Sequence, residues 1–175
     1  TKLRKDWVDR FHSSKDLQTF GPRDRIFWIR FGLPFPVSDR DYVLRVKAEL
    51  DHAKRVFTAR LKSERHPAKP EEGGCCERGR AFGTYYRFTA LSDGKTKVMV
   101  EVHTDPKGWL PGWLVNVIQK EWPRKTLRGL IKRSQRPDIS EYAGTENWHK
   151  PPPAPAPTPA PTPAPAPAPA PAPTK

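Results

Sequence analysis

The stretch FWIRFGLPFPVSDRDYVLRVKAEL, residues 27–50, contains two strand-like segments joined by a loop that two prolines make rigid. Proline fixes its own φ angle and keeps the preceding residue extended, so Pro34-Phe35-Pro36 is not helical and holds Phe35 outward. After the loop, charged side chains alternate with an apolar row made of Tyr42, Leu44, Val46, Ala48 and Leu50. This period of two predicts a strand over residues 40–51 with one apolar face.

The same alternation predicts six strands in all, over residues 15–20, 25–33, 40–51, 54–64, 79–91 and 96–104. The later strands have apolar rows of Phe57, Ala59 and Leu61, then Phe82, Thr84, Tyr86 and Phe88, then Val98, Val100 and Val102. Short turns between the strands favour an antiparallel meander with one apolar face. Residues 1–12 have apolar side chains at helical spacing and are predicted to be the end of a helix.

The apolar face of the sheet needs a cover, and residues 109–133 contain the long helical pattern that can supply it. Apolar side chains recur there every three or four residues: Leu110, Trp113, Leu114, Val117, Ile118, Leu127, Leu130 and Ile131. Pro123 is expected to kink or interrupt this helix. Basic residues gather on the same stretch: Lys107, Lys120, Arg124, Lys125, Arg128, Lys132, Arg133 and Arg136. The fold class is therefore α+β, a sheet covered by a basic C-terminal helix.

Composition divides the chain into a foldable part, residues 1–149, and a tail, residues 150–175, that is almost entirely Pro, Ala and Thr. The tail is expected to be disordered or polyproline II, and to act as a spacer or as a ligand for a proline-recognising domain. The formal net charge of the 175 residues is +13, which favours anionic partners such as membranes or nucleic acid.

Two adjacent cysteines, Cys75 and Cys76, do not make a disulfide framework, and their spacing from His66 matches no zinc pattern. We therefore expect no metal and no cofactor, and a reducing compartment. No apolar run is long enough to cross a bilayer, so the protein is predicted to be cytoplasmic and to associate peripherally with membranes. A targeting segment ahead of Thr1 stays open, because patterned sequence begins at the first residue.

Two motifs in order, PFPVSDRDYV at 34–43 and HTDPKGWLPGWLVN at 103–116, followed by a basic helix, resemble the START family of lipid-binding domains. The resemblance runs from about residue 3 to 134 and is greatest to the phosphatidylcholine-transfer group. It implies a helix-grip fold, in which an antiparallel sheet wraps around the C-terminal helix and a tunnel between them holds one lipid. The family has further helices and strands ahead of the matched region, so the N-terminal part of the domain is expected to be missing.

The resemblance also implies a set of site residues. Arg4, in the segment RKDW, would meet a lipid phosphate, and Tyr42 would be one member of an aromatic cage for choline. Ile29 and Thr84 stand where the family pattern has aromatics, although Tyr86 is on the same face, so a phospholipid is expected without choline specificity. A sterol-like ligand stays the alternative. The expected lipid-binding residues are Arg4, Phe27, Ile29, Phe31, Tyr42, Leu44, Thr84, Tyr86, Phe88, Val100, Trp113 and Val117. The loop at 32–39 would be the lipid entrance, and the expected membrane contacts are Phe35, Val37, Trp109, Lys120, Arg124 and Arg128.

The expected function is therefore binding, and intermembrane transfer, of a lipid without catalysis. Relatives of this fold include polyketide cyclases, which makes a cyclase-like enzyme the first alternative. Its candidate acid-base groups, Glu101 and His103, alternate with Val100 and Val102 and should face solvent. The second alternative is a basic nucleic-acid-binding module, but no DNA- or RNA-binding motif is present, so no nucleic-acid partner is expected.

Overall fold

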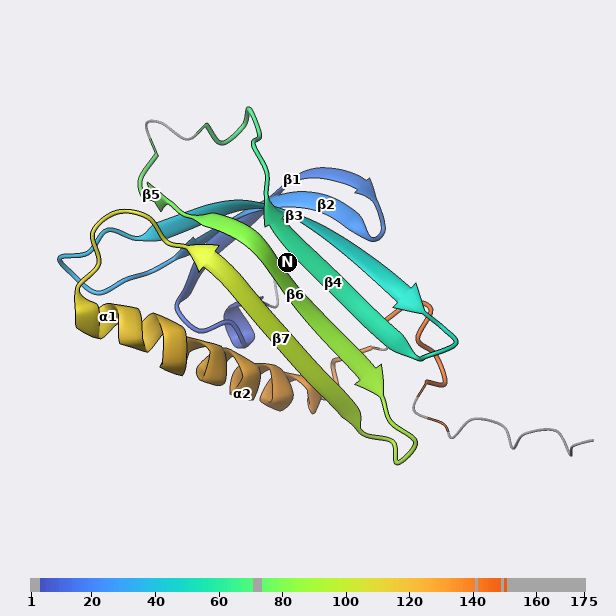
Figure 1. Ribbon diagram of the computed structural model, residues 1–175. Helices are drawn as coiled ribbons and strands as arrows, with labels where there is room; N and C mark the ends of the chain where they lie inside the picture. The colour runs from blue at the N-terminus through green and yellow to red at the C-terminus, as the bar shows by residue number, and fades with distance from the viewer. Residues whose placement is uncertain (1–3, 71–73, 141, 149, 151–175) are drawn as a thin grey trace, which may run out of the picture.

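A computed structural model describes residues 4–70, 74–140, 142–148 and 150 of the chain. In these residues one antiparallel sheet has the strand order β1-β2-β3-β4-β6-β7, and a helical segment lies across one side of it (Figure 1). A two-residue strand, β5 (Glu77–Arg78), pairs in parallel with the start of β3. The main strands are β1 (Phe11–Gly21), β2 (Asp24–Phe31), β3 (Arg40–Asp51), β4 (Val56–Ser63), β6 (Arg80–Ala90) and β7 (Thr96–Asp105).

The strand register brings the apolar rows of neighbouring strands onto one face, which we call the inner face. Phe27 lies opposite Leu44, and Ile29 lies opposite Tyr42. Residues directly opposite each other on neighbouring strands share a face. The rows continue through β4, β6 and β7 by the pairs Val46↔Leu61, Leu50↔Phe57, Phe57↔Phe88 and Phe88↔Val98. The predicted antiparallel sheet is confirmed.

Buried apolar side chains lie on both faces of β2 and β3. The inner face holds the larger cluster, made of Phe27, Ile29, Tyr42, Leu44 and Ala81. The opposite, outer face holds Ile26, Trp28 and Val43. There the segment between β4 and β5 lies over the sheet, with the Lys69 ammonium 3.9 Å from the centre of the Trp28 ring. These parts of β2 and β3 are therefore covered from both sides, as the apolar run at residues 26–29 of β2 requires.

Strand β7 differs from this centre because it is an edge of the sheet. Its inner-face residues Val98 and Val102 are 37% and 51% exposed, and Met99 on the outer face is 41% exposed. The sequence pattern predicts that the row of Val98, Val100 and Val102 faces the covered side of the sheet. The register places this row on the inner face, but Val98 and Val102 remain exposed there. On the neighbouring strand, a register shift between Ala81 and Gly83 buries Ala81 and leaves Phe82 exposed. Phe82 is therefore wrongly included in the predicted apolar row.

The predicted N-terminal helix is wrong within the described residues. Residues 4–6 form a single 3-10 turn, η1 (Arg4–Asp6), and β1 already begins at Phe11. The segment instead contacts the C-terminal helix through its backbone, and a Cβ added at Gly129 would lie 2.5 Å from the Trp7 carbonyl oxygen. The Trp122 Nε1 donates to the Asp9 carbonyl at 2.9 Å, and the Asp9 N–H donates to the Thr126 Oγ1 at 3.3 Å. The N-terminal segment is held between the sheet and the helix.

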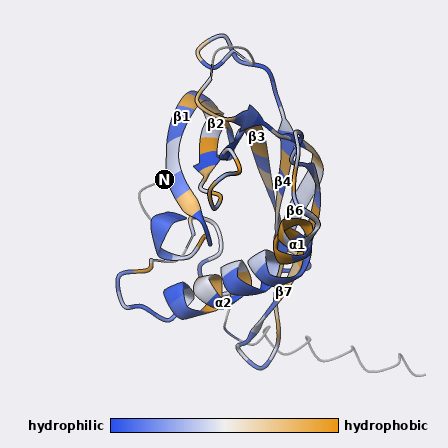
Figure 2. Cartoon of the chain, turned by 90° about the vertical axis from the view of Figure 1, so that its left-hand side faces the viewer, coloured by the Kyte–Doolittle hydropathy of each residue, from blue (hydrophilic) through white to orange (hydrophobic). Residues whose placement is uncertain are grey.

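The C-terminal helical segment consists of α1 (Gly112–Asn116), the π-helical turn η2 (Val117–Glu121) and α2 (Trp122–Ser134). It lies on the inner-face side of the curved sheet, as the view along the strands shows (Figure 2). Pro123 falls in the first turn of α2, directly after the π-helical turn, whose C-cap Trp122 N–H donates to the Val117 carbonyl. The expected interruption therefore takes the form of the π-helical turn just before the proline. The Pro/Ala tail, apart from Lys150, lies outside the described residues.

Candidate functional site

The loop between β2 and β3 is anchored by a carboxylate that the sequence pattern did not single out. Asp39 accepts the Leu33 N–H at 2.9 Å and the Arg30 Nε at 2.7 Å. Burial pushes the pKa of Asp39 upward, but these hydrogen bonds hold the pKa below its ordinary value. Asp39 therefore stays ionised and closes the base of the loop that carries Phe35.

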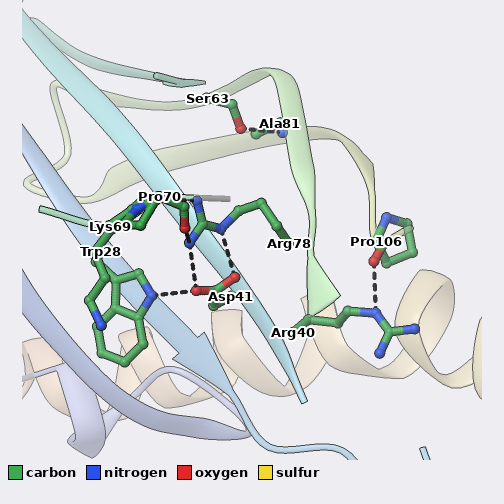
Figure 3. Close-up of polar contacts among 9 residues, drawn as sticks. All are labelled: Trp28, Arg40, Asp41, Ser63, Lys69, Pro70, Arg78, Ala81 and Pro106. Carbon is green, nitrogen blue, oxygen red and sulfur yellow. Dashed lines mark hydrogen bonds and ion pairs between the residues drawn. The ribbon is translucent and has the colours of Figure 1, made fainter. Parts of the chain in front are cut away.

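Arg40 joins this loop to the segment that follows β7 (Figure 3). The side chain is 3% exposed, and its guanidinium donates to the carbonyls of Ser38 at 2.5 Å, Pro106 at 2.7 Å and Lys107 at 2.9 Å. Since one planar cation satisfies carbonyls of both segments, the β2–β3 loop and the start of the helical segment are held at the same end of the sheet.

Asp41, the neighbour of Arg40, faces a different set of partners. Its carboxylate accepts the Trp28 Nε1 at 2.6 Å and the Arg78 Nε and Nη2 at 2.7 and 3.0 Å (Figure 3). Arg40 and Asp41 therefore do not pair with each other. Alternation sends the two side chains to opposite faces of β3, and each holds a segment that is distant in the sequence.

Three aromatic side chains are exposed at the end of the molecule that Arg40 organises. Phe35 is 96% exposed, Trp109 is 72% exposed and Trp113 is 55% exposed. Val37, in the same loop as Phe35, is only 7% exposed and is turned inward. We call Phe35, Trp109 and Trp113 the aromatic tip. Large aromatics exposed together at one end of the molecule make the aromatic tip a candidate contact site.

Most of the residues expected to bind lipid are brought together on the inner face. Phe27, Ile29, Tyr42, Leu44 and Thr84 are buried there. The ring of Phe31 makes edge contacts with Tyr42 at 5.9 Å and with Trp122 at 4.7 Å between centroids. The remaining expected residues on this face or on the helix are half-buried, namely Tyr86, Phe88, Val100 and Val117. Trp113 is set apart from them by its exposure.

A charged cluster interrupts this apolar surface near its middle. The Arg4 guanidinium stacks 3.8 Å from the centre of the Phe27 ring, and the Arg25 Nε lies 3.9 Å from the Asp16 Oδ1. The Arg4 Nη1 and the Arg25 Nε are buried and have no hydrogen-bond partner in the described part of the structure. Burial, and then repulsion from Arg25, lower the pKa of Arg4 to about 10, so it is still a cation at neutral pH. Two cations share one acid here.

Arg25 and Asp16 are absent from the residues expected from the sequence. Arg25 could have been found, because it falls on the same alternation phase as Phe27 and Ile29 and is thus an arginine in an apolar row. Asp16 could not, because its position beside Arg25 depends on the pairing of β1 with β2, which contains register shifts. The register places Asp16 opposite Phe27, the residue on which Arg4 stacks.

The outward side of the helical segment is basic. Lys120, Arg124 and Arg128 are exposed, and within the described residues they make no ion pair. Lys125 is partly neutralised by Glu121, with 3.3 Å between the Nζ and Oε2 atoms. Since this side faces away from the sheet, its charge is available to an anionic partner.

Two other features of the described chain offer less chemistry. A cavity of about 560 Å³ near β5 is lined by residues of mixed charge, among them Glu64, Arg65, Glu77, Arg80 and Lys107. Burial and the neighbouring Cys75 raise the pKa of Cys76 to about 12, which makes it a poor nucleophile.

In the part of the chain that is described, no three His, Cys, Asp or Glu side chains are grouped to hold a metal, and no helix has the length and apolarity to span a bilayer.

Comparison with known proteins gives one family. Residues 1–138 match the START domain. Phosphatidylcholine transfer protein of Bos taurus is 32% identical over 114 residues, which are 63% of this chain and 52% of that protein. An uncharacterised protein of Pseudomonas aeruginosa is 29% identical over 131 residues, 74% of this chain and 62% of that protein. The chain therefore spans between half and two thirds of the length of these relatives.

Solved structures agree with this assignment at the level of fold. Human STARD10 superposes with a TM-score of 0.64 at 21% identity, covering 75% of this chain and 52% of that chain. Human StAR-related lipid transfer protein 5 superposes with the same TM-score at 17% identity, covering 75% of this chain and 65% of that chain. The sheet with its covering C-terminal helix is the architecture that these structures share.

Proposed function

This chain belongs to the START domain family, and from that premise we propose that it binds one phospholipid between the inner face and the helix and carries it between membranes. The observation that carries the proposal is the charged cluster around Arg4. A buried guanidinium nitrogen without a hydrogen-bond partner is costly, and an ionised phosphate oxygen is the group that satisfies it best. The half-buried apolar side chains around the cluster would contact the hydrocarbon of the same ligand.

Phosphate recognition by two arginines does not fix the rest of the headgroup. Tyr42 is on the inner face, and burial raises its pKa to about 12, so its ring stays neutral and available for cation–π contact. Ile29 and Thr84, also on this face, offer no aromatic ring. We therefore propose a phospholipid ligand over a sterol-like one, because a sterol has no anionic group for Arg4, and we assign no choline preference.

Extraction of lipid from vesicles tests this proposal. The purified chain is incubated with vesicles of mixed phospholipids and sterol, separated from them, and examined by native mass spectrometry. We expect one phospholipid per chain and little sterol. A folded protein that carries no lipid, or that carries sterol in preference to phospholipid, would contradict the proposal.

The aromatic tip is proposed to touch the donor and acceptor membranes. Phe35→Ser and Trp109→Ser are each expected to lower partition into anionic vesicles about tenfold, because each removes a large apolar side chain from the bilayer surface. Neither should change the thermal midpoint, since both side chains are already exposed. Leu91→Ser is the matched control, a 38% exposed apolar residue in the turn between β6 and β7. Equal partition of Phe35→Ser and the wild type in vesicle sedimentation would remove this role.

The basic side of the helix is proposed to supply the electrostatic part of docking. Replacing Lys120, Arg124 or Arg128 singly with glutamine should lower partition about fivefold at low salt, since each charge near an anionic surface contributes about 1 kcal/mol. The difference should shrink as salt rises. Lys97→Gln serves as the control, because Lys97 is an exposed cation on β7 and not on the helix. An effect that does not depend on salt would argue against electrostatic docking.

The alternative functions receive less support. Glu101 and His103, the candidate acid-base pair of a cyclase, are both exposed, and the His103 ring lies beside Phe82, 5.1 Å between centroids. General acid-base groups of an enzyme need to reach a bound substrate, and these two point away from the inner face. We therefore propose a binding and transfer function without catalysis.

A further inference from the structure

Residues 142–148, which follow the helix and lie beyond the START match, form a short segment that we call the strap. It lies beside the end of the β3–β4 hairpin, at the opposite end of the sheet from the aromatic tip (Figure 1, orange). The Tyr142 ring packs against Phe57 with 5.1 Å between centroids, and Phe57 in turn contacts Phe88 at 5.8 Å. Phe57 and Phe88 belong to the last apolar row of the inner face.

The far end of the strap is fixed to the same hairpin by further contacts. The Trp148 ring meets His52 edge-on at 5.7 Å. The Arg55 Nη1 donates to the carbonyl of Trp148 at 3.3 Å and to that of Lys150 at 2.7 Å. Two residues of the turn between β3 and β4 therefore hold the strap in place, His52 by an aromatic contact and Arg55 by hydrogen bonds.

The strap also has an internal structure that suits this position. Gly144 has a φ of +91°, which strains any larger residue, and a Cβ added there would lie 2.9 Å from the Leu50 Cδ1, so a larger residue requires Leu50 or the strap to shift. The Gly144 N–H donates to the Glu146 carboxylate at 2.9 Å, and this bond lowers the pKa of Glu146. The backbone turns back twice, with Thr145 N–H bonded to the Tyr142 carbonyl and Trp148 N–H to the Thr145 carbonyl. The close approach of Gly144 to Leu50 again places the strap on the last inner row.

The inner face between the charged cluster and the strap is apolar and long enough to contact most of an acyl chain. Arg25 is opposite Val46, and Leu50 stands four residues farther along β3, which is about 13 Å at the rise of a strand. Between the two rows the inner face presents Ala48, Ala59, Tyr86 and Val100. A phosphate at Arg4 and Arg25 would leave this apolar stretch for one acyl chain, with Tyr142 and Phe57 at its end.

We propose that the strap is the end wall of the proposed lipid site and sets the longest acyl chain that the protein accepts. This inference rests on the proposed phospholipid function and adds a residue to it: Tyr142 determines chain-length specificity. It also assigns a role to a segment outside the family match.

The test uses the full chain and its Tyr142→Ala variant, each offered equimolar dimyristoyl, dipalmitoyl and distearoyl phosphatidylcholine in mixed vesicles. Extracted lipid is quantified by mass spectrometry. The wild type should favour the shorter chains, and Tyr142→Ala should raise the ratio of distearoyl to dimyristoyl lipid roughly tenfold, about the effect of burying two more methylenes. Tyr142→Phe is the matched control, because it keeps the ring and should keep the wild-type ratio.

A second variant acts by another route. Gly144→Val should push the strap off Leu50 and should shift the chain-length ratio in the same direction. Lys150→Ala, which changes an exposed side chain just after the strap, should leave the ratio unchanged. If the wild type extracts phospholipid but all variants show its chain-length ratio, the strap is not an end wall and only this inference falls. If the wild type extracts no phospholipid, the proposed function falls and the inference with it.

Discussion

Asp41→Ala is expected to lower the free energy of unfolding by about 3–5 kcal/mol, because it breaks a buried ion pair and leaves the other charge in place. Asp41 is 4% exposed and is the carboxylate partner of both Arg78 and the Trp28 indole. Without it, the segment between β4 and β5 loses its tie to the centre of the sheet, and the outer apolar cluster around Trp28 loses its cover. Denaturant unfolding followed by Trp fluorescence measures the change.

The control for this prediction is Asp24→Ala. Asp24 also accepts two hydrogen bonds from an arginine, Arg45, both at 2.9 Å, but this pair is on the surface. Its removal should cost far less stability, because water screens and replaces a surface ion pair. Similar losses for Asp41→Ala and Asp24→Ala would show that burial of the Asp41 cluster does not govern its contribution.

Arg4→Met is expected to weaken phospholipid binding about 100-fold while leaving the stability of the empty protein unchanged or higher. A hydrogen bond between charged groups contributes about 1.5–3 kcal/mol, and the Arg4 site is proposed to make such a bond to phosphate. Methionine keeps the length of the side chain and its contact with Phe27, but it removes a buried charge whose lowered pKa shows that the fold disfavours it. Opposite or independent changes in binding and stability are the signature of a ligand-binding arginine.

Two measurements check this expectation, a titration with vesicles that contain a fluorescent phospholipid and a thermal melt of delipidated protein. Lys5→Met is the matched control, since Lys5 is the exposed neighbour of Arg4 and should affect neither. If Arg4→Met instead destabilises the empty protein and binds lipid as the wild type does, Arg4 is a structural residue and the phosphate site must lie elsewhere.

The sequence predicts the sheet well because alternation is a local signal. The rows that contain Leu44 and Leu61 are readable from single strands, and their pairing follows from short turns. Strand β5 carries no such signal, since a two-residue strand has no period, and it depends on Asp41 pairing with an arginine 37 residues away. The helical spacing near Trp7 misleads for a similar reason, because this segment is placed by backbone contacts of Trp7 and Asp9 with the C-terminal helix.

The candidate site is readable from the sequence only in part. Arg4 comes from resemblance to a known family, and the inner-face residues come from periodicity. Asp16, Asp39 and the strap were missed, since each acts through a partner brought close by tertiary structure: Arg25, Arg30 and Phe57, respectively. Side-chain partnerships of this kind are fixed by register and by loop geometry, which a periodic pattern does not encode.

The half-buried rows of the inner face have a consequence for handling the protein. Val46, Leu61, Phe57 and Phe88 are only half-buried by the part of the chain that the structure describes. Any apolar molecule that fills the space will stabilise the folded state by mass action, in proportion to the logarithm of its concentration over its Kd. Preparations that retain different amounts of host lipid should therefore melt at different temperatures, and a single melting curve should show two transitions when loaded and empty molecules exchange slowly.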